Sequence, residues 1–308
     1  MPIKDYNILM DRDISRYLSV VETAKKWNMS ERSVRNYCAQ GKIDGAYLVG
    51  KTWNIPADAV KPDRLNRNTP ETLLERLQYE KKNGIAGGIY HKIQIDLTYN
   101  SNHIEGSRLT HDQTRYIYET NTIGVDDTAL KVDDIVETAN HFKCIDLIID
   151  NAKRPLSEGF IKELHRVLKN GTTDSRSSWF VVGGYKKLPN EVGGKETVSP
   201  EKVSESVKLL LDLYNSIDDV TFEDILDFHY WFESIHPFQD GNGRIGRLIM
   251  FKECLSHNIV PFIIDENLKM YYYRGLNEWT KEHGYLVDTC LSAQDAFKEY
   301  LDYFKIKY

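Results

Sequence analysis

The chain has 308 residues, which is enough for a full hydrophobic core and one accessory domain. Its 28% charged and 41% hydrophobic residues are typical of an ordinary soluble protein. There is no leading apolar segment and no apolar run of membrane-spanning length, which argues against secretion and membrane insertion, so we expect a cytoplasmic protein.

Cysteine spacing and charge add two constraints. Four cysteines are widely scattered, without the paired spacing of zinc or redox sites, so we expect buried free thiols. The net charge of −6 is uneven: residues 1–62 hold ten Lys/Arg against seven Asp/Glu, a net charge of +3, and the remainder carries −9.

The first unit, residues 1–62, is predicted to contain two short helices and a hairpin. Apolar residues at helical spacing predict a helix over Val20–Trp27, followed by a turn at Asn28–Met29. Ser30 is a good N-cap for a second helix over Glu31–Gln40, which Gly41 would close. Tyr47–Ile55 is predicted to form a hairpin turning at Gly50-Lys51.

This arrangement resembles the winged helix-turn-helix of MerR and excisionase-like DNA-binding domains. In that reading Arg32, Arg35 and Asn36 face outward from the second helix, as a recognition helix in a major groove requires. A net charge of +3 is modest for DNA binding. The alternative is a small helical module that docks on a protein partner.

A second region, residues 63–110, begins with a polar linker over Asp63–Pro70. Helices are predicted over Glu71–Lys82 and Ile85–Asn100. The stretch Ser101–Gly106, which follows at once, reads on its own as a helix end with Gly106 as the cap. Residues 111–308 then form the third region.

This third region is expected to be mainly helical, with one hairpin. Helices are predicted over Thr110–Glu119, Val132–Asp150 and Ser157–Leu168, and His141 and His165 are expected to be satisfied core or surface residues. Within Ser177–Gly194, a β-prone run at Trp179–Val182 and a break at Gly183-Gly184 predict a hairpin.

The stretch from His236 to Arg247 organises the rest of the chain. It follows an amphipathic helix over Phe222–Ile235, and Pro237 disfavours a helical conformation at His236, so the helix should end there. Gly241 and Gly243 permit a tight turn close to a ligand. The unpaired N–H groups where the next helix starts form an anion site.

The other residue types in this stretch fit a nucleotide phosphate at that anion site. Asp240 supplies a hard oxygen for Mg2+. Arg244 and Arg247, three positions apart, share one helix face and suit bidentate phosphate recognition. His236 is the candidate general base, because its ordinary pKa lies near physiological pH.

The complete stretch resembles the Fic family signature His-x-Phe-x-(Asp/Glu)-Gly-Asn-Gly-Arg-x-x-Arg at every fixed position. The resemblance implies transfer of AMP from ATP onto a Ser, Thr or Tyr hydroxyl of a target protein, with His236 as the base and Asp240 holding Mg2+. It implies that Gly241, Asn242, Gly243 and Arg244 cradle the α- and β-phosphates and that Arg247 meets the γ-phosphate. The intact Gly-Asn-Gly favours nucleotidyl over phosphoryl transfer.

The same resemblance assigns roles elsewhere. Ser101, Glu105 and Gly106 match the inhibitory motif (Ser/Thr)-x-x-x-Glu-(Gly/Asn), which implies that Glu105 pairs with Arg247 and blocks the γ-phosphate position. The hairpin with Gly183, Gly184, Tyr185 and Lys186 occupies the place of the flap that aligns the target. Tyr272 and Tyr273 match a turn near the base or ribose, although such a tyrosine cluster is as often core.

The sequence therefore predicts an autoinhibited protein adenylyltransferase with a Fic fold, ATP as co-substrate and Mg2+ as cofactor. Self-modification and a homodimer are further implied by the resemblance, and DNA is a possible partner of residues 1–62. Three alternatives stay open: removal of AMP from a modified protein, transfer of another nucleotide or phosphate-containing group, and a DNA-binding regulator that uses the Fic core to sense nucleotides.

Overall fold

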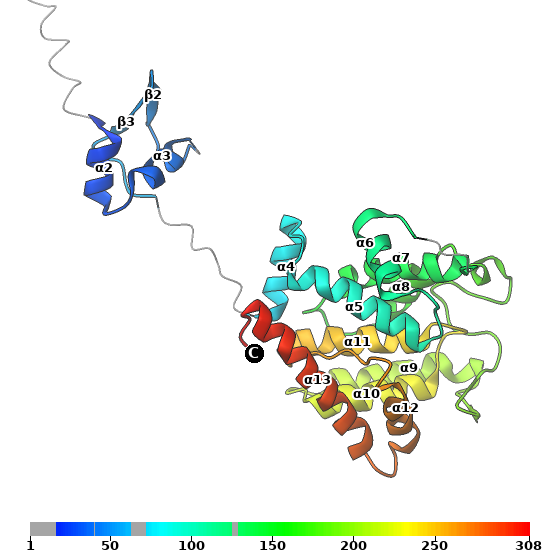
Figure 1. The fold of residues 1–308 in the computed structure, drawn as a ribbon. Helices are drawn as coiled ribbons and strands as arrows, with labels where there is room; N and C mark the ends of the chain where they lie inside the picture. Colours follow the sequence, from blue (N-terminus) through cyan, green and yellow to red (C-terminus); the bar gives the residue numbers. More distant parts are fainter. Residues whose placement is uncertain (1–16, 40, 63–71, 125–128) are drawn as a thin grey trace, which may run out of the picture. The chain divides into compact units, whose positions relative to one another are not determined.

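The computed structural model describes residues 17–39, 41–62, 72–124 and 129–308. The chain divides into two compact units, Met1–Thr69 and Pro70–Tyr308 (Figure 1). Each unit has its own cluster of buried apolar side chains. The predicted linker over Asp63–Pro70 lies outside the described residues.

The N-terminal unit consists of two helices packed against a three-stranded antiparallel sheet of order β1-β3-β2. Val34 and Ile55 are fully buried between the layers. Val49 pairs with Thr52, so the hairpin turns at Gly50-Lys51 as predicted. The elements are β1 (Tyr17–Leu18), α2 (Val20–Trp27), α3 (Glu31–Ala39), β2 (Tyr47–Val49) and β3 (Thr52–Pro56).

In its described residues, the larger unit contains helices, connecting loops and one two-stranded hairpin. The helices in the described part of this unit are α4 (Leu73–Asn83), α5 (Ile89–Ile104), α6 (His111–Thr120), α7 (Val132–Asp150), α8 (Glu158–Lys169), α9 (Pro200–Asn215), α10 (Phe222–Ile235), α11 (Asn242–Ser256), α12 (Lys269–Glu278) and α13 (Gly284–Phe304). The hairpin is β4 (Glu191–Val192) and β5 (Lys195–Glu196).

Helix α11 is the centre of this unit. It runs between α5 and α10 (Figure 1) and also contacts α4, α7 and α8. Nearly all of its residues are buried, the polar ones Arg244, Arg247 and Lys252 included. A helix enclosed on all sides must give each of its charges a partner, because an unpaired buried charge is very costly.

Residues from the predicted second region belong to the same core. Leu77 of α4 and Ile93 of α5 lie in one apolar cluster with Leu248 of α11. The structure thus places α4 and α5 in the larger unit, and the three-part division at residues 63 and 111 stays a prediction.

The described residues bear on two expectations, one about membrane-spanning helices and one about the cysteines. Across the described part of the chain, no helix combines the length and apolarity that crossing a bilayer requires. Cys38, Cys144, Cys254 and Cys290 are buried free thiols, as predicted.

The predicted position of the hairpin is wrong. Trp179–Val182 forms no strand, and the strands lie further along the chain at β4 and β5, with the turn at Gly193-Gly194. The physical reason is burial: Phe180 is only 5% exposed and its ring packs beside the His165 imidazole. The β-prone run is therefore a packed turn over α8.

The four residues predicted to lie on that hairpin precede it instead. The Gly183 N–H donates to His165 Nδ1 at 2.9 Å, and Gly184 N–H closes a turn on the Val181 carbonyl. Lys186 N–H donates to the Pro237 carbonyl at 2.9 Å. Gly183, Gly184, Tyr185 and Lys186 thus lie against α8 and the stretch from His236 to Arg247.

We expect Ile148→Ala to lower the free energy of unfolding of the larger unit by about 2–5 kcal/mol, because it leaves a cavity in the core. Ile148 on α7 is fully buried in the main apolar cluster. Val132→Ala is the control: on the same helix Val132 is 70% exposed, so its effect should stay within about 0.5 kcal/mol. Denaturant unfolding measures both, and equal effects would contradict the assignment of this core.

Candidate active site

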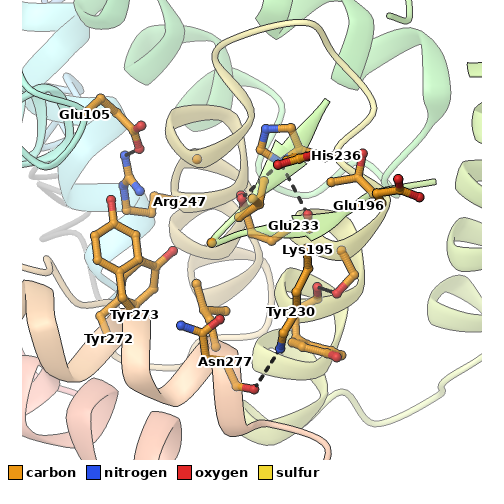
Figure 2. A pocket seen from close by; sticks show the side chains of 17 residues that line it. Glu105, Lys195, Glu196, Tyr230, Glu233, His236, Arg247, Tyr272, Tyr273 and Asn277 are labelled. Atoms are coloured by element: carbon orange, nitrogen blue, oxygen red, sulfur yellow. Dashed lines mark hydrogen bonds and ion pairs between the residues drawn. The ribbon is translucent and has the colours of Figure 1, made fainter. Parts of the chain in front are cut away.

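A cavity of about 690 Å³ opens beside the start of α11 (Figure 2). Its walls come from the β4–β5 hairpin, the end of α10, the start of α11 and helix α12. Apolar and polar surface both contribute to the wall, and the polar side chains include Glu105, Lys195, Glu196, Glu233, His236, Arg247, Tyr273 and Asn277. A cavity of this size in which polar groups converge beside apolar and aromatic surface is a usual form of a small-molecule site.

His236 lies where α10 ends, at the edge of this cavity. Pro237 follows it, and His236 adopts a left-handed conformation, φ 51°, that ends the helix as predicted. Its Nδ1 lies 3.3 Å from the Glu233 carbonyl oxygen, which can only accept, so Nδ1 carries the hydrogen and Nε2 keeps a free lone pair. Burial lowers the pKa of His236 to about 4. The imidazole is therefore neutral at physiological pH, as a general base must be.

The turn between α10 and α11 is shaped by Gly241 and Asn242. Gly241 has φ 87°, a conformation that favours glycine. The Asn242 side chain is buried and pairs with both backbone groups of Phe238, at 2.8 and 2.9 Å. That side chain holds the turn, and its backbone begins the helix whose N–H groups were predicted to bind an anion.

Glu105 lies next to the start of α11, where the anion site was predicted. Its Oε1 lies 2.6 Å from Arg247 NH2, and a side chain at Gly243 would collide with the carboxylate. Burial alone would raise the pKa of Glu105, but Arg247 and Arg244 together outweigh burial and hold that pKa below the ordinary value. The carboxylate thus stands above the N-terminus of α11 as an anion.

Arg247 is held by the last turn of α5 as well. Its Nε donates to Ser101 Oγ at 3.1 Å, and its NH2 donates to the Ser101 carbonyl at 2.9 Å. Gly106, with φ 92°, then lets the chain leave the helix. The structure therefore brings Ser101, Glu105 and Gly106 together with Arg247, across more than a hundred residues of sequence.

Asp240 and Arg244 belong to a second cluster, which the sequence did not indicate. Lys169 Nζ lies 2.5 Å from Asp240 Oδ2, and Arg244 NH2 lies 3.5 Å from the same oxygen. Glu137 contacts both Lys169 and Arg244. Burial opposes ionisation of Asp240, yet Arg244 and Lys169 lower its pKa to about 2.

The surroundings of Asp240 fit a magnesium ion that arrives with phosphate. Among the described residues no group of three or more His, Cys, Asp or Glu side chains could hold a metal alone. A single protein carboxylate with phosphate oxygens is a usual ligand set for Mg2+. The side chain of Asp240 is 47% exposed, so it is accessible to such a complex.

The two predicted pocket tyrosines differ in their surroundings. Both line the cavity, but Tyr272 is almost fully buried and its hydroxyl lies 2.5 Å from His229 Nε2. Tyr273 is 36% exposed, and its hydroxyl donates to the Ile104 carbonyl at 3.5 Å. Tyr272 is therefore part of the wall, and Tyr273 offers an accessible ring.

Asn277 and Lys195 also line the cavity but were not predicted. Asn277 lies in α12, four positions after Tyr273, so the tyrosine motif was a sequence signal that could have found it. Lys195 of β5 donates to the Asn277 carbonyl at 3.4 Å. This contact connects the hairpin with α12 across the cavity (Figure 2).

Lys186 joins the base of the hairpin to the end of α10. Its ammonium group donates to the Asn190 side chain, the Thr197 hydroxyl and the Ile235 carbonyl, at 2.7, 2.5 and 3.2 Å. Burial lowers the pKa of Lys186 to about 8. Although it is not on a strand, Lys186 thus ties the hairpin to the residue before His236.

His165 holds the other side of the turn. Its ring stacks on Phe238 with 4.0 Å between centroids, and its Nε2 lies 3.2 Å from the Asp240 carbonyl oxygen. Because Nδ1 accepts from the Gly183 N–H, Nε2 is the donor. The expectation of a satisfied core histidine is confirmed.

In the N-terminal unit, Arg32, Arg35 and Asn36 are exposed on α3, on the side opposite the buried Val34. Arg35 NH2 lies 2.9 Å from Glu31 on the same helix. The structure thus gathers the three predicted DNA-contact residues on one helix face.

Comparison with known proteins agrees with the architecture of the larger unit. Residues 155–254 match the model of the Fic/DOC family. Protein adenylyltransferases of Caenorhabditis elegans and Nematostella vectensis are each 27% identical to the chain over 184 residues, 58% of this chain. That match covers only 35% and 42% of those two proteins, so the chain spans less than half of their length.

A solved structure shows the same fold. The Fic domain-containing signalling protein of Bacteroides thetaiotaomicron has a TM-score of 0.59 at 26% identity, covering 74% of this chain and 94% of that one. The mainly helical Fic fold predicted from the sequence is confirmed.

We expect His236 to remain neutral until the pH falls close to 4, because burial disfavours the imidazolium. NMR of protein with labelled histidine, titrated from pH 8 to pH 4, measures this, and the spectrum of His236→Ala assigns the resonance. A signal that disappears in His236→Ala but titrates between pH 6 and pH 7 would contradict the buried environment.

Proposed function

We propose that this protein is a Mg2+-dependent protein adenylyltransferase that transfers AMP from ATP to a Ser, Thr or Tyr hydroxyl of a target protein. The observation that carries the proposal is the position of His236, which lines the same cavity as Arg247 and as Gly243 at the start of α11. The matches to the Fic/DOC family and to two protein adenylyltransferases support it.

The chemistry follows from these residues. Nε2 of His236 takes the proton of the target hydroxyl as the oxygen attacks the α-phosphorus; the new O–P bond forms while the bond to the β-phosphate oxygen breaks, and pyrophosphate leaves. The α11 N–H groups and Arg244 stabilise the charge on the phosphates, so positioning and electrostatics supply most of the catalysis. Mg2+ held by Asp240 would neutralise the phosphates and orient them.

We also propose that the protein is autoinhibited. The Glu105 carboxylate already fills the anion site and pairs with the buried Arg247 at 2.6 Å. A terminal phosphate that needs Arg247 must displace this carboxylate. A charge-assisted pair that is largely buried is strong, so ATP would bind in a pose unsuited to attack while Glu105 stays in place.

The β4–β5 hairpin is our candidate for target alignment. It lines the cavity through Glu191, Val192 and Lys195, and its residues are exposed. Lys186 fixes the base of the hairpin next to α10. A short exposed hairpin offers an edge on which an extended target segment can pair through its backbone.

We expect Glu105→Gly to label target proteins, or the protein itself, at least about tenfold more strongly than wild type, because it frees Arg247 for phosphate. The measurement is transfer from α-labelled ATP with Mg2+ in cell extract. Glu105→Gly/His236→Ala should lose the label. Glu282→Gly is the control, since Glu282 is exposed, lies outside any helix and does not line the cavity.

Each other outcome of this experiment favours a different reading. Equal labelling of wild type and Glu105→Gly would remove the inhibitory role. Loss of label from a target protein that already carries labelled AMP would indicate AMP removal. Labelling of protein by a different nucleotide, but not by ATP, would show that ATP is not the donor. No transfer in any variant would leave a nucleotide-sensing regulator as the better reading. Size-exclusion chromatography with light scattering would test the homodimer.

We further propose that the N-terminal unit binds DNA through the exposed face of α3 that carries Arg32, Arg35 and Asn36. Neutralised phosphates dominate such affinity. Arg32→Ala/Arg35→Ala should therefore weaken binding to duplex DNA. It should also make the slope of log affinity against log salt concentration shallower by the amount expected for about two phosphate contacts. Fluorescence anisotropy at several salt concentrations measures this.

The matched control for the DNA measurement is Lys281→Ala/Lys305→Ala, which also removes two exposed cations. Equal losses in the two double variants would point to non-specific attraction. No binding by the wild type would favour a protein-docking module.

A further inference from the structure

The cluster around Asp240 is a closed ring of four alternating charges. Lys169 of α8 contacts Glu137 of α7, Glu137 contacts Arg244 of α11, Arg244 contacts Asp240, and Asp240 contacts Lys169. Three separate parts of the chain, α7, α8 and the stretch from Asp240 to Arg244, thus meet at one place. Two cations and two anions give the ring a net charge of zero.

Lys169 is the least exposed member of this ring. Its side chain is 3% exposed, compared with 6% for Arg244, 12% for Glu137 and 47% for Asp240. A buried ammonium group depends on its carboxylate partners, because a buried charge that has neither water nor a partner is strongly destabilising. The buried Lys169 ammonium group is therefore held between Glu137 and Asp240.

The ring changes what Asp240 offers to a metal ion. Its Oδ2 lies 2.5 Å from one cation and 3.5 Å from another. A divalent ion that approaches alone meets a carboxylate whose charge is already balanced, and it must also give up its tightly held water. The phosphates of a nucleotide would supply both the missing negative charge and the remaining oxygen ligands.

We propose that Lys169 is a positioning residue that serves as the built-in counter-cation of Asp240, so that a divalent metal binds together with the nucleotide and not before it. Lys169 orients the carboxylate that faces the metal, and Glu137 orients Arg244 at the phosphates. The part that concerns the nucleotide rests on the proposed function; the part that concerns the metal alone does not.

The test is the affinity of the protein for Mn2+ without nucleotide. EPR measures the concentration of unbound Mn2+ during the titration. Lys169→Met leaves the ring with a net charge of −1, so it should bind Mn2+ at least about tenfold more tightly than wild type. Lys169→Met/Asp240→Asn should lose this gain. A protein that was merely destabilised would not bind the metal more tightly.

Two further variants separate charge from shape. Lys169→Met/Glu137→Gln has a neutral ring again, so its Mn2+ affinity should return to the wild-type level, and Lys169→Arg should match wild type throughout. Lys162→Met is the matched control, because Lys162 is on the same helix and pairs with Glu158, outside the ring. An unchanged Mn2+ affinity in folded Lys169→Met would overturn the proposal.

A second measurement applies if Lys169→Met does not fold. Glu137→Gln keeps Lys169 and gives the ring a net charge of +1, so α,β-methylene-ATP alone should bind several-fold more tightly than to wild type, and Mn2+ should add less to its affinity. Equal effects of Mn2+ on both proteins would contradict the counter-cation role. Failure of α,β-methylene-ATP to bind wild type would contradict the proposed function but leave the nucleotide-free result standing.

Discussion

The burial of α11 is the constraint on which the rest of the larger unit depends. Its first turns carry Arg244 and Arg247, both almost fully buried, and buried guanidinium groups require carboxylates within contact distance. Glu105 and Glu137 meet that requirement from α5 and α7. The same contacts that make this helix stable therefore assemble a charged site at its N-terminus.

This arrangement gives the two arginines different partners. Arg247 is paired with a residue at the end of α5 that a phosphate could replace, whereas Arg244 is fixed within a ring that includes Asp240. Arg247 thus has one carboxylate partner, Glu105, whereas Arg244 has two, Glu137 and Asp240. In the proposed reaction the first would respond to ATP, and the second would keep the metal-facing carboxylate in place.

Local rules predicted the parts of the site that are close in sequence. Pro237 ends α10 and Gly241 allows the turn that follows. Because these two effects act within a few residues, they could be predicted, together with the position of His236 at the edge of the cavity. The hairpin was misplaced for the opposite reason. The apolar pattern of Trp179–Val182 fits a strand and a packed turn equally well, and only the contact of Phe180 with His165 decides between them.

The sequence by itself determined the helical class of the larger unit, the end of α10 and the glycine turn after it, and it named the candidate base, carboxylate and arginines of the proposed site. These features depend on helix periodicity, on proline and glycine geometry and on side-chain chemistry, all of which act locally. Only the tertiary structure decided that Lys169 and Glu137 complete the charged ring, that Lys186 ties the hairpin to α10, and that His236 is neutral. Those outcomes depend on burial and on contacts between residues far apart in the chain, which no local pattern specifies.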